Sequence, residues 1–457
     1  MKKKKKWVAL QFTDISGRLR EVIVPSSQMT KENIETGFSK LDGSSIPGFM
    51  GIEESDMVLT PVMDTEKRLP WKPDTSRVLN KISYAGGSKR FEKDPRYVAE
   101  KTESVINDMG YSGFFGPEVE FFIIDGFAFY NQTPSTGLGY SLRSEENPSI
   151  GSSPAIGYKE GYYSSQPIDR TYDTRSKIVE ALQDSFGFDI EASHHEVATN
   201  GQVEINFRFG RLVDTADMVQ TLKYAARNIA HADGKHASFV PKPFFGDNGS
   251  GMHVNTSLSG KDGKNAFYDA EDDYAQLSQL GRYAVGGIMQ HADALSAIVS
   301  PTTNSYRRLT PGFEAPVYIA WGRSNRSAIV RVPSYKKDME KTKRIEYRAP
   351  DPSANPYLAL SAIALAEIDG IRKKIDPGDP INKSIYRLSK EEIKKLGVKQ
   401  LPSSLEQALD SLESDNAFLK GVFTEPLLET YIEMHRNEAR ELNRYPSPVE
   451  IERLDGI

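Results

Sequence analysis

The sequence of 457 residues contains no cysteine, so disulfide bonds and thiolate metal sites are excluded. No apolar run approaches the roughly 18 residues that a membrane span needs. The formal net charge of −5 and the isoelectric point near 5.9 argue against a nucleic-acid partner, which normally requires a basic face. Neither the Gly-x-x-x-x-Gly-Lys-Ser/Thr phosphate loop nor the Gly-x-Gly-x-x-Gly dinucleotide motif occurs. Any bound nucleotide is therefore held by some other structure.

The remaining composition is that of a soluble globular protein, with 38% hydrophobic and 26% charged residues. Because the chain is longer than one core usually supports, we expect a small domain, 1–90, and a large domain, 91–457. The run Lys2–Lys6 resembles the start of a signal peptide, but Trp7–Phe12 is too short and too polar for its apolar region. We predict a solvated lysine tail and a cytoplasmic location.

The hydrophobic periodicity supports this division. Before residue 90, strands are predicted at 7–24, 57–60 and 78–82 between turn residues, which indicates a small β-rich unit. After residue 90, strands alternate with helices: the strands are predicted at 118–124, 189–207 and 251–258, and the helices at 98–109, 174–186, 215–233, 274–298 and 355–369. Gly370 is expected to end the last helix. The segment 131–165, rich in Gly, Ser, Tyr and Asn, is predicted to be a long loop, either an active-site flap or an exposed insertion.

The segment from Ser193 to Phe207 contains Asn200-Gly201 between two alternating apolar runs, which predicts a β-hairpin. A two-residue loop would place Glu196 and Glu204 on opposite faces. A three-residue loop, with Gly201 left-handed, would pair the two glutamates directly on one face. Carboxylates that face each other in a sheet repel. We therefore predict the three-residue loop, with a cation between the carboxylates.

Further candidate ligands lie on two other predicted strands. Glu118 and Glu120 share one face of an apolar strand, because side chains alternate with a period of two. The alternative is a pair of exposed acids on an edge strand. His253, Asn255 and Ser257 likewise share a face, and this histidine is as consistent with a structural role as with metal binding.

Arginines accumulate beside these acids. Arg344, Glu346 and Arg348 share one face of a predicted strand, and Arg308, Arg326 and Arg331 precede them. Taken singly, each arginine is more consistent with a surface charge, but together they suit metal-bound phosphate and an acidic substrate. A ligand set of five glutamates and one histidine favours Mg²⁺ or Mn²⁺ over zinc. These residues therefore indicate phosphoryl transfer from a nucleotide.

In combination, the motifs resemble glutamine synthetase of the type I family over nearly the whole chain, and specifically its shorter, non-adenylylated I-alpha-like subtype. The motifs that carry the resemblance are Leu41-Asp42-Gly43-Ser44-Ser45-Ile46, Glu54-Ser55-Asp56-Met57, Gly116-Pro117-Glu118-Val119-Glu120, His194-His195-Glu196-Val197-Ala198, Gly201-Gln202-Val203-Glu204, Asn248-Gly249-Ser250-Gly251-Met252-His253, Asn325-Arg326-Ser327 and Arg344-Ile345-Glu346-Tyr347-Arg348. The resemblance implies an α+β fold. A small N-terminal β-grasp domain would precede a large C-terminal catalytic domain with a curved antiparallel sheet flanked by helices.

The resemblance also implies a reaction. The γ-carboxylate of glutamate attacks the γ-phosphate of ATP, and ammonia then displaces phosphate from γ-glutamyl phosphate. Two or three Mg²⁺ or Mn²⁺ ions would serve each site. The residues implied for the metal near the substrate are Glu120, Glu196 and Glu204, and those for the metal that bridges the ATP phosphates are Glu118, His253 and Glu346.

The other site residues are implied by the same motifs. Asp42, Glu314 and Arg326 would be catalytic: the two acids receive and deprotonate ammonium, and Arg326 stabilises the transferring phosphoryl group. The residues implied for substrate binding are Asn248, Gly249, Arg308, Arg348, Ser45 and Tyr162, and those for ATP are Phe209, Ser257, Arg331, Lys341 and Arg344. The family forms two face-to-face hexameric rings with sites between subunits, so a homododecamer is expected.

Some departures from the family pattern keep alternatives open. Only about six residues precede the first strand, Leu41 replaces the usual Phe, and the 159–169 loop differs from its apolar version. Gly51 stands where the subtype uses an arginine for glutamine feedback, and the flanks of Tyr386 do not match an adenylylation site. The alternatives are a γ-glutamyl-polyamine or -monoamine ligase and a non-catalytic structural or regulatory paralogue.

Overall fold

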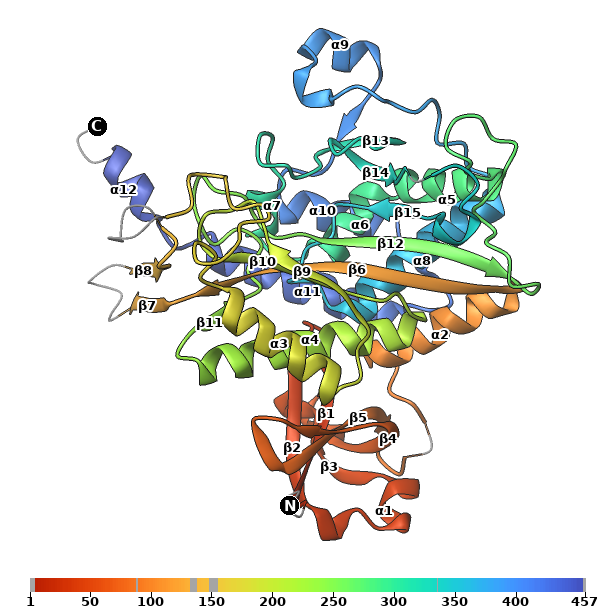
Figure 1. Cartoon of the computed structure of the whole chain (residues 1–457). Coiled ribbons are helices and arrows are strands. Elements are labelled where there is room, and N and C mark those ends of the chain that lie inside the picture. Colours follow the sequence, from red (N-terminus) through yellow and green to blue (C-terminus); the bar gives the residue numbers. More distant parts are fainter. Residues whose placement is uncertain (1–4, 88, 132–137, 148–154, 335, 455–457) are drawn as a thin grey trace.

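The computed structural model describes residues 5–454, except for residues 88, 132–137, 148–154 and 335. Its strands form a five-stranded sheet from the first part of the chain, a nine-stranded sheet from the remainder, and a separate two-stranded hairpin. Figure 1 shows the five-stranded sheet as a small unit beneath the larger body of sheet and helices. The predicted β-grasp unit and α+β catalytic unit therefore agree with the observed architecture.

Among its described residues, the small unit contains five strands and one short α-helix. They are β1 (Trp7–Thr13), β2 (Leu19–Pro25), α1 (Lys31–Thr36), β3 (Phe38–Asp42), β4 (Asp56–Leu69) and β5 (Lys72–Tyr84), with the strands ordered β2-β1-β5-β4-β3. The central pair, β1 and β5, is parallel and the other pairs are antiparallel. The alternating residues Val8, Leu10 and Phe12 are buried in the core, and the residues between them, Ala9 and Gln11, are buried on the other face of β1.

The nine-stranded sheet supplies the framework of the site. Its strands are β6 (Tyr111–Ile124), β9 (Ile190–His195), β10 (Gln202–Phe207), β11 (His236–Ser238), β12 (Met252–Gly260), β13 (Tyr318–Arg323), β14 (Ala328–Val332), β15 (Ile345–Tyr347) and β16 (Lys399–Gln400). The order is β16-β13-β14-β15-β12-β6-β10-β9, and β11 pairs with β6. All pairs are antiparallel, as predicted, except the parallel pair β13 and β14.

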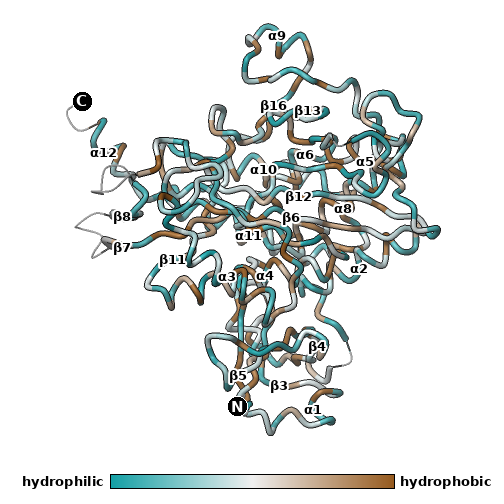
Figure 2. The backbone as a smooth tube through the Cα atoms, in the orientation of Figure 1, coloured by the Kyte–Doolittle hydropathy of each residue, from teal (hydrophilic) through white to brown (hydrophobic). Residues whose placement is uncertain are grey.

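Helices cover the nine-stranded sheet, with α2 and α4 packed on β6 and α5 on β13 to β15. The helices of the large unit are α2 (Pro95–Asp108), α3 (Tyr172–Asp184), α4 (Leu212–Ala232), α5 (Gln279–Gln290), α6 (Ala292–Val299), α7 (Ser305–Arg308), α8 (Pro356–Lys373), α9 (Lys390–Lys395), α10 (Leu405–Ser414), α11 (Glu425–Leu442) and α12 (Pro448–Leu454). Figure 2 shows hydrophobic residues concentrated on the inner elements, and nearly all of α8 is buried.

Within the part of the chain that the structure describes, no helix has both the length and the apolar character needed to cross a membrane.

Two predicted helices differ from the observed ones. The single helix expected at 274–298 is two helices, α5 and α6, which meet at His291. The helix expected to stop at Gly370 continues to Lys373 and ends with Lys374 in the left-handed conformation. A Cβ on Gly370 would lie 2.2 Å from the carbonyl oxygen of Tyr283 in α5. Gly370 therefore permits two helices to pack closely and does not end one.

The long loop predicted at 131–165 lies partly outside the described residues. Within the described part, Leu138–Arg143 forms β8, which pairs with β7 (Gly126–Asn131) as an antiparallel hairpin. The prediction of an unbroken loop is therefore wrong for residues 138–143. The alternation of Leu138, Tyr140 and Leu142 was the available signal for this strand.

Candidate active site

The register of the nine-stranded sheet places acidic residues of β6 and β10 in one row, and a third acid lies just beyond the end of β9. On β10, Glu204 lies opposite His194 of β9 on one side and Glu120 of β6 on the other. Glu196 follows His194 by two residues and therefore belongs to the same face. His194 lies between the glutamates, with its Nδ1 3.6 Å from Glu196 Oε1 and its Nε2 3.4 Å from Glu204 Oε1.

A second row extends from β10 through β6 to β12. Glu118 of β6 lies opposite Asn206 on one side and His253 of β12 on the other. The His253 Nδ1 is 3.3 Å from Glu118 Oε2 and 3.7 Å from Glu346 Oε1. Asn255, two residues beyond His253, donates its side-chain amide to Glu118 Oε1 at 3.0 Å.

Glu346 on β15 continues the same face beyond β12. It lies opposite Asn255 on β12 and Arg331 on β14. Its carboxylate is buried and accepts hydrogen bonds at 2.6 Å from Arg331 Nη1 and Arg348 Nη1. The alternation predicted for Arg344, Glu346 and Arg348 therefore holds. Arg331 and Arg348 are paired with a buried acid and are not isolated surface charges.

The hairpin that supplies Glu196 and Glu204 has a different register from the predicted one. Val203 pairs with His195, and the amide of Glu196 donates to Gln202 O at 2.8 Å, which leaves residues 197–201 as a five-residue loop. The predicted three-residue loop and the direct pairing of the two glutamates are therefore wrong. The predictions of a shared face and of a left-handed Gly201, with φ of 80°, are confirmed.

Local contacts fix the position of Glu196. The ring of the neighbouring His195 is fully buried, with its Nδ1 donating to Glu196 O at 2.6 Å and its Nε2 bonded to Glu146 Oε2 at 3.0 Å. Burial lowers the pKa of His195, but the hydrogen bond and charge of Glu146 outweigh it and raise the pKa above its usual value. The pair therefore ties the backbone beside Glu196 to a loop 50 residues earlier, at Glu146.

The acids of the first row carry unfavourable charge when no cation is bound. Burial and the charges of Glu196 and Glu204 raise the pKa of Glu120 well above its usual value. Burial, followed by the charge of Glu204, raises the pKa of Glu196 to about 7. In the second row, burial and the charge of Arg348 lower the pKa of His253 well below its usual value. His253 is therefore neutral, as a metal-binding imidazole must be.

Two groups on this face have the geometry of metal ligands. Ligand atoms of Glu118, His253 and Glu346 lie within 4.8 Å of one another, and so do those of His194, Glu196 and Glu204. The first group is the set implied by the resemblance for one metal. The second contains two of the three residues implied for the other metal, with His194 in place of Glu120. Oxygen-rich donor sets such as these suit Mg²⁺ or Mn²⁺.

A cavity of about 430 Å³ lies against this face. The predicted site residues that line it are Glu118, Glu120, Tyr162, Glu196, Glu204, Asn248, Gly249, His253, Arg308, Glu314, Arg326, Arg331 and Arg348. Three buried polar atoms in or beside it have no hydrogen-bond partner among the residues that the structure describes: Asn248 Oδ1, Arg331 Nε and Arg348 Nε. Buried polar atoms are normally satisfied, so these indicate the position of a polar ligand.

A second cavity of about 320 Å³ adjoins the first, and Glu118 and Asn206 line both. It contains the predicted nucleotide residues Phe209, Ser257, Lys341 and Arg344. The ring of Phe209 is half exposed and packs edge-on against Phe114, with a centroid distance of 5.6 Å. The cavity therefore offers an exposed aromatic surface next to basic groups.

Two loops contribute to the lining of the first cavity. Glu314 is exposed, and its backbone adopts a left-handed φ of 58°, which is uncommon for a residue other than glycine. On the opposite loop, the rings of Tyr162 and Tyr163 stack at 4.1 Å, and both meet the edge of His194. Burial and the adjacent Tyr163 raise the pKa of Tyr162 to about 12, so its hydroxyl keeps its proton.

Asp42 and Ser45 do not line either cavity, because both belong to the small unit at the end of β3. Asp42 is exposed, and its carboxylate accepts hydrogen bonds from the Ser44 amide at 2.9 Å and the Ser44 hydroxyl at 2.7 Å. Those hydrogen bonds lower its pKa, so the carboxylate is ionised and faces outward.

The sequence prediction missed three residues of the site. His194 would face Asn206 in the predicted hairpin register, so the register error concealed its position between two glutamates. Gln202 donates its side-chain amide to Glu120 Oε2 at 3.1 Å and to Gly249 O at 3.0 Å. Asn206 lines both cavities, and its position two residues after Glu204 was the available signal.

Family comparisons cover almost all of the chain. Residues 92–454 match the family described as "Glutamine synthetase, catalytic domain", and residues 4–84 match "Glutamine synthetase, beta-Grasp domain". The glutamine synthetase of Sulfolobus acidocaldarius is 54% identical over 447 residues, 98% of this chain and 94% of the relative. That of Escherichia coli K12 is 42% identical over 460 residues, 98% of this chain and 96% of the relative.

Solved structures give the same fold. A cryo-EM structure of Plasmodium falciparum glutamine synthetase has a TM-score of 0.87 and 28% identity, with 98% of this chain and 95% of that chain covered. A structure described as a GmaS/ADP complex has a TM-score of 0.84 and 28% identity, with 99% and 97% covered.

Proposed function

The chain belongs to the glutamine synthetase family, and we propose that it joins ammonia to the γ-carboxylate of L-glutamate, using ATP. The observation that carries this proposal is the meeting of two carboxylate-rich groups with several arginines in one cavity, beside a second cavity with an aromatic wall. Such a site can hold metal-bound phosphate and an acidic substrate together.

Two divalent cations, Mg²⁺ or Mn²⁺, would occupy the acidic face. Glu118, His253 and Glu346 would hold one ion, and Glu120, Glu196 and Glu204 the other. Divalent ions here would neutralise the phosphate charge and hold ATP beside glutamate. The raised pKa of Glu120 and of Glu196 supports the second assignment, because a bound cation would relieve the repulsion that causes both shifts.

The substrates would lie across the two cavities. ATP would place its adenosine against Phe209 and Ser257, with Arg344 nearby, and its phosphates near Arg331 and Lys341. Glutamate would bind through four residues around the buried end of the first cavity: Asn248, Gly249, Arg308 and Arg348. Arg326, whose side chain is exposed at the cavity rim, would stabilise the phosphoryl group during transfer.

Ammonium would enter at the part of the first cavity that Tyr162 and Glu314 line. Glu314 would close the cavity, exclude water from γ-glutamyl phosphate and accept a proton from ammonium, because only neutral ammonia attacks. Asp42 and Ser45 would act from a neighbouring subunit, which accounts for their outward position on the small unit. The active form would then be a homo-oligomer, a dodecamer of two hexameric rings in the cytoplasm, with residues 1–90 and 91–457 as its domains.

An organic amine is the alternative acceptor, with the same fold and the same acyl phosphate. The comparisons favour ammonia, because relatives named glutamine synthetase reach 54% and 42% identity, whereas the GmaS structure is 28% identical. Asp42, Ser45, Tyr162 and Glu314, the residues assigned to ammonium, are all retained.

Phosphate release tests the proposal. The protein would be incubated with ATP, glutamate and Mg²⁺ or Mn²⁺, in parallel with ammonium, putrescine, ethylamine or no acceptor. We expect rapid release with ammonium, together with equimolar glutamine. Release with only putrescine or ethylamine would contradict the assignment of ammonia. No release under any condition would indicate a non-catalytic paralogue.

A further inference from the structure

A separate cavity of about 870 Å³ lies between the small unit and the large unit, and we call it the interdomain cavity. One wall is the turn between β1 and β2, residues 16–19, and another is the face of α4 that carries Lys223 and Arg227. The remaining walls come from the segments 238–241, 301–304 and 352–353 and from the end of α11. It shares no lining residue with the two cavities of the proposed active site.

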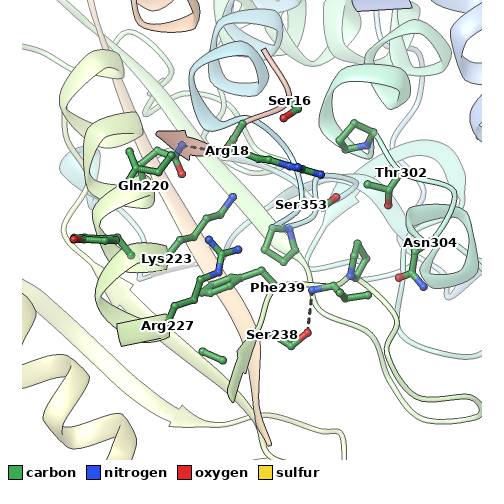
Figure 3. Close-up of a pocket in the computed structure, with 18 of the residues that line it drawn as sticks. Ser16, Arg18, Gln220, Lys223, Arg227, Ser238, Phe239, Thr302, Asn304 and Ser353 are labelled. Carbon is green, nitrogen blue, oxygen red and sulfur yellow. Dashed lines mark hydrogen bonds between the residues drawn. The ribbon is translucent and has the colours of Figure 1, made fainter. Parts of the chain in front are cut away.

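Three cationic side chains enter this cavity from two different walls. Figure 3 shows Lys223 and Arg227 reaching in from α4, and Arg18 reaching in from the β1–β2 turn. Lys223 is buried, and its Nζ donates one hydrogen bond, to Ala354 O at 3.1 Å. The guanidinium of Arg227 lies over the ring of Phe239, 5.0 Å from its centroid.

The structure gives these cations no close carboxylate partner among the described residues. The ion pairs of the described chain do not include Lys223, Arg227 or Arg18. Burial and the charge of Arg227 lower the pKa of Lys223 to about 7, and the charge of the buried Asp351 opposes this shift only in part. A buried cation with no carboxylate at ion-pair distance is unfavourable, so an anion in the cavity would stabilise it.

Two acids and two histidines also line the cavity. Glu21 accepts a hydrogen bond from Gln11 Nε2 at 3.0 Å, and Glu438 lies 3.8 Å from the Nδ1 of His435. The ring of His236 stacks on Phe127 at 5.2 Å. Glu21 therefore has a partner of its own. Burial lowers the pKa of His435 to about 4, so its ring is neutral and forms no ion pair with Glu438, whose side chain is 53% exposed to solvent. The serine and threonine side chains of Ser16, Ser238, Thr302, Thr303 and Ser353 complete a polar lining.

The cavity also adjoins the loop proposed to bind glutamate. Pro241 lines the cavity, and its carbonyl accepts a hydrogen bond from the Ser250 amide at 2.8 Å, next to Gly249. Asn304 lines it too, and its backbone carbonyl accepts from the Arg308 amide at 3.3 Å. A Cβ on Gly249 would lie 2.4 Å from Pro241 O. The wall of the interdomain cavity at Pro241 is therefore in direct contact with the loop at Gly249, which belongs to the proposed glutamate site. A shift of the cavity wall would therefore move residues at the glutamate position.

We propose that the interdomain cavity is a regulatory site for a compact dianion, the phosphate or dicarboxylate group of a small metabolite. Lys223, Arg227 and Arg18 supply the charge. The Ser16 and Ser353 hydroxyls already donate to Asp14 and Asp351, whereas the Ser238 hydroxyl accepts from the Val240 amide and keeps its proton for a ligand. Occupancy changes the affinity for glutamate through Pro241 and Asn304. The regulatory effect rests on the proposed function, whereas anion binding does not.

Tungstate, a heavy dianion with the shape of phosphate, locates the site directly. Crystals of the wild-type protein soaked in tungstate are expected to give an anomalous peak between Lys223, Arg227 and Arg18. The peak is expected to disappear in Lys223→Met and in Arg227→Gln, and to persist in Lys101→Met. Lys101 is a suitable control because it is also partly buried and donates to a backbone carbonyl, that of Val422. Soaks that add competing phosphate or malonate distinguish the two sources of the dianion.

Three outcomes of this experiment would overturn the proposal. They are tungstate bound only at the active-site cavity, a peak unchanged in both cavity variants, and a cavity filled by a neighbouring subunit. A second measurement compares the KM for glutamate with and without the competing anion in each variant. We expect a change of about fivefold or more in the wild type and in Lys101→Met, and at most half of it in Lys223→Met. Equal changes in all three proteins would refute regulation through the cavity even if tungstate binds there.

Discussion

Glu204 and Glu120 lie directly opposite each other on the antiparallel strands β10 and β6, in the interior of the protein. Facing carboxylates repel, and burial adds to the cost of ionising both. Burial, the charge of Glu196 and the charge of Glu204, in that order, raise the pKa of Glu120 well above its usual value. A protein retains such a pair at a cost in stability when a ligand relieves it, so the metal-free and metal-bound forms are expected to respond oppositely to loss of one carboxylate.

The first prediction concerns Glu204→Gln, which keeps the side-chain shape and removes the charge. Without metal, we expect a higher midpoint of thermal unfolding than in the wild type, because the repulsion with Glu120 is lost. With Mn²⁺ at about 100 times its Kd, the wild type should gain about 2.7 kcal/mol and the variant much less. Calorimetry with and without Mn²⁺ measures both effects, with the exposed Glu441→Gln as the control. Equal stabilisation of both proteins by Mn²⁺ would remove Glu204 from the metal site.

A second prediction concerns the loop that joins β9 to β10. Gly201 has a φ of 80°, and a Cβ there would lie 2.3 Å from the carbonyl oxygen of Ile123. Gly187 has a similar φ of 77°, but no atom lies within 4 Å of its added Cβ. Gly187→Ala should therefore lower the free energy of unfolding by about 1 kcal/mol, from backbone strain alone. Gly201→Ala should lower it by about 2–4 kcal/mol, because the clash adds to the strain. Denaturant titration of both variants measures the difference, and equal losses would show that the loop absorbs the clash.

Alternation along strands made much of this site predictable from the sequence. The period of two placed Glu118 with Glu120, His253 with Asn255, and Glu346 with Arg348 on shared faces. It could not show which strands are neighbours, because β6, β10, β12 and β15 come together from more than 200 residues of chain. The family resemblance predicted that the acids of these strands share one site. The register of the sheet then explained how the strands bring them together.

The errors have identifiable physical causes. Asn200-Gly201 favours a tight turn, but the loop extends to Val197, where the Ala198 amide donates to Gln202 Oε1 and the Thr199 amide to Asp247 Oδ2. These contacts outweigh the local turn preference. Gly370 has a similar explanation, because the neighbouring helix α5 packs so closely that a Cβ at this position would clash with its backbone. Neither partner could be identified from residues close in the sequence.

The third prediction concerns pH and Glu367, which lies on α8 behind the active-site sheet and accepts a hydrogen bond from the Thr256 hydroxyl at 2.5 Å. Burial raises its pKa to about 8, from an ordinary value of 4.5. The folded protein therefore holds a proton that the unfolded chain has released between these two pH values. Stability is lost as pH rises through this window, by up to about 1.4 kcal/mol per pH unit relative to Glu367→Gln. Denaturant titrations of both proteins from pH 5 to 9 measure the slope, and parallel profiles would contradict the raised pKa.

The final prediction concerns the outward position of Asp42. If its carboxylate completes the site of a neighbouring subunit, Asp42→Ala and Glu204→Ala damage different halves of each site. Each variant alone should be nearly inactive. When the two are unfolded, mixed in equal amounts and reassembled, random association gives some sites an intact Asp42 from one subunit and an intact Glu204 from the other. About a quarter of the wild-type activity should return for sites shared between two subunits. Two inactive variants of the same large-unit face, Glu204→Ala and Glu346→Ala, provide the control, because their mixture cannot form an intact site. Equal activity in both mixtures would place Asp42 outside the shared site. Recovery of activity only in the mixture of Asp42→Ala with Glu204→Ala would place Asp42 in the shared site.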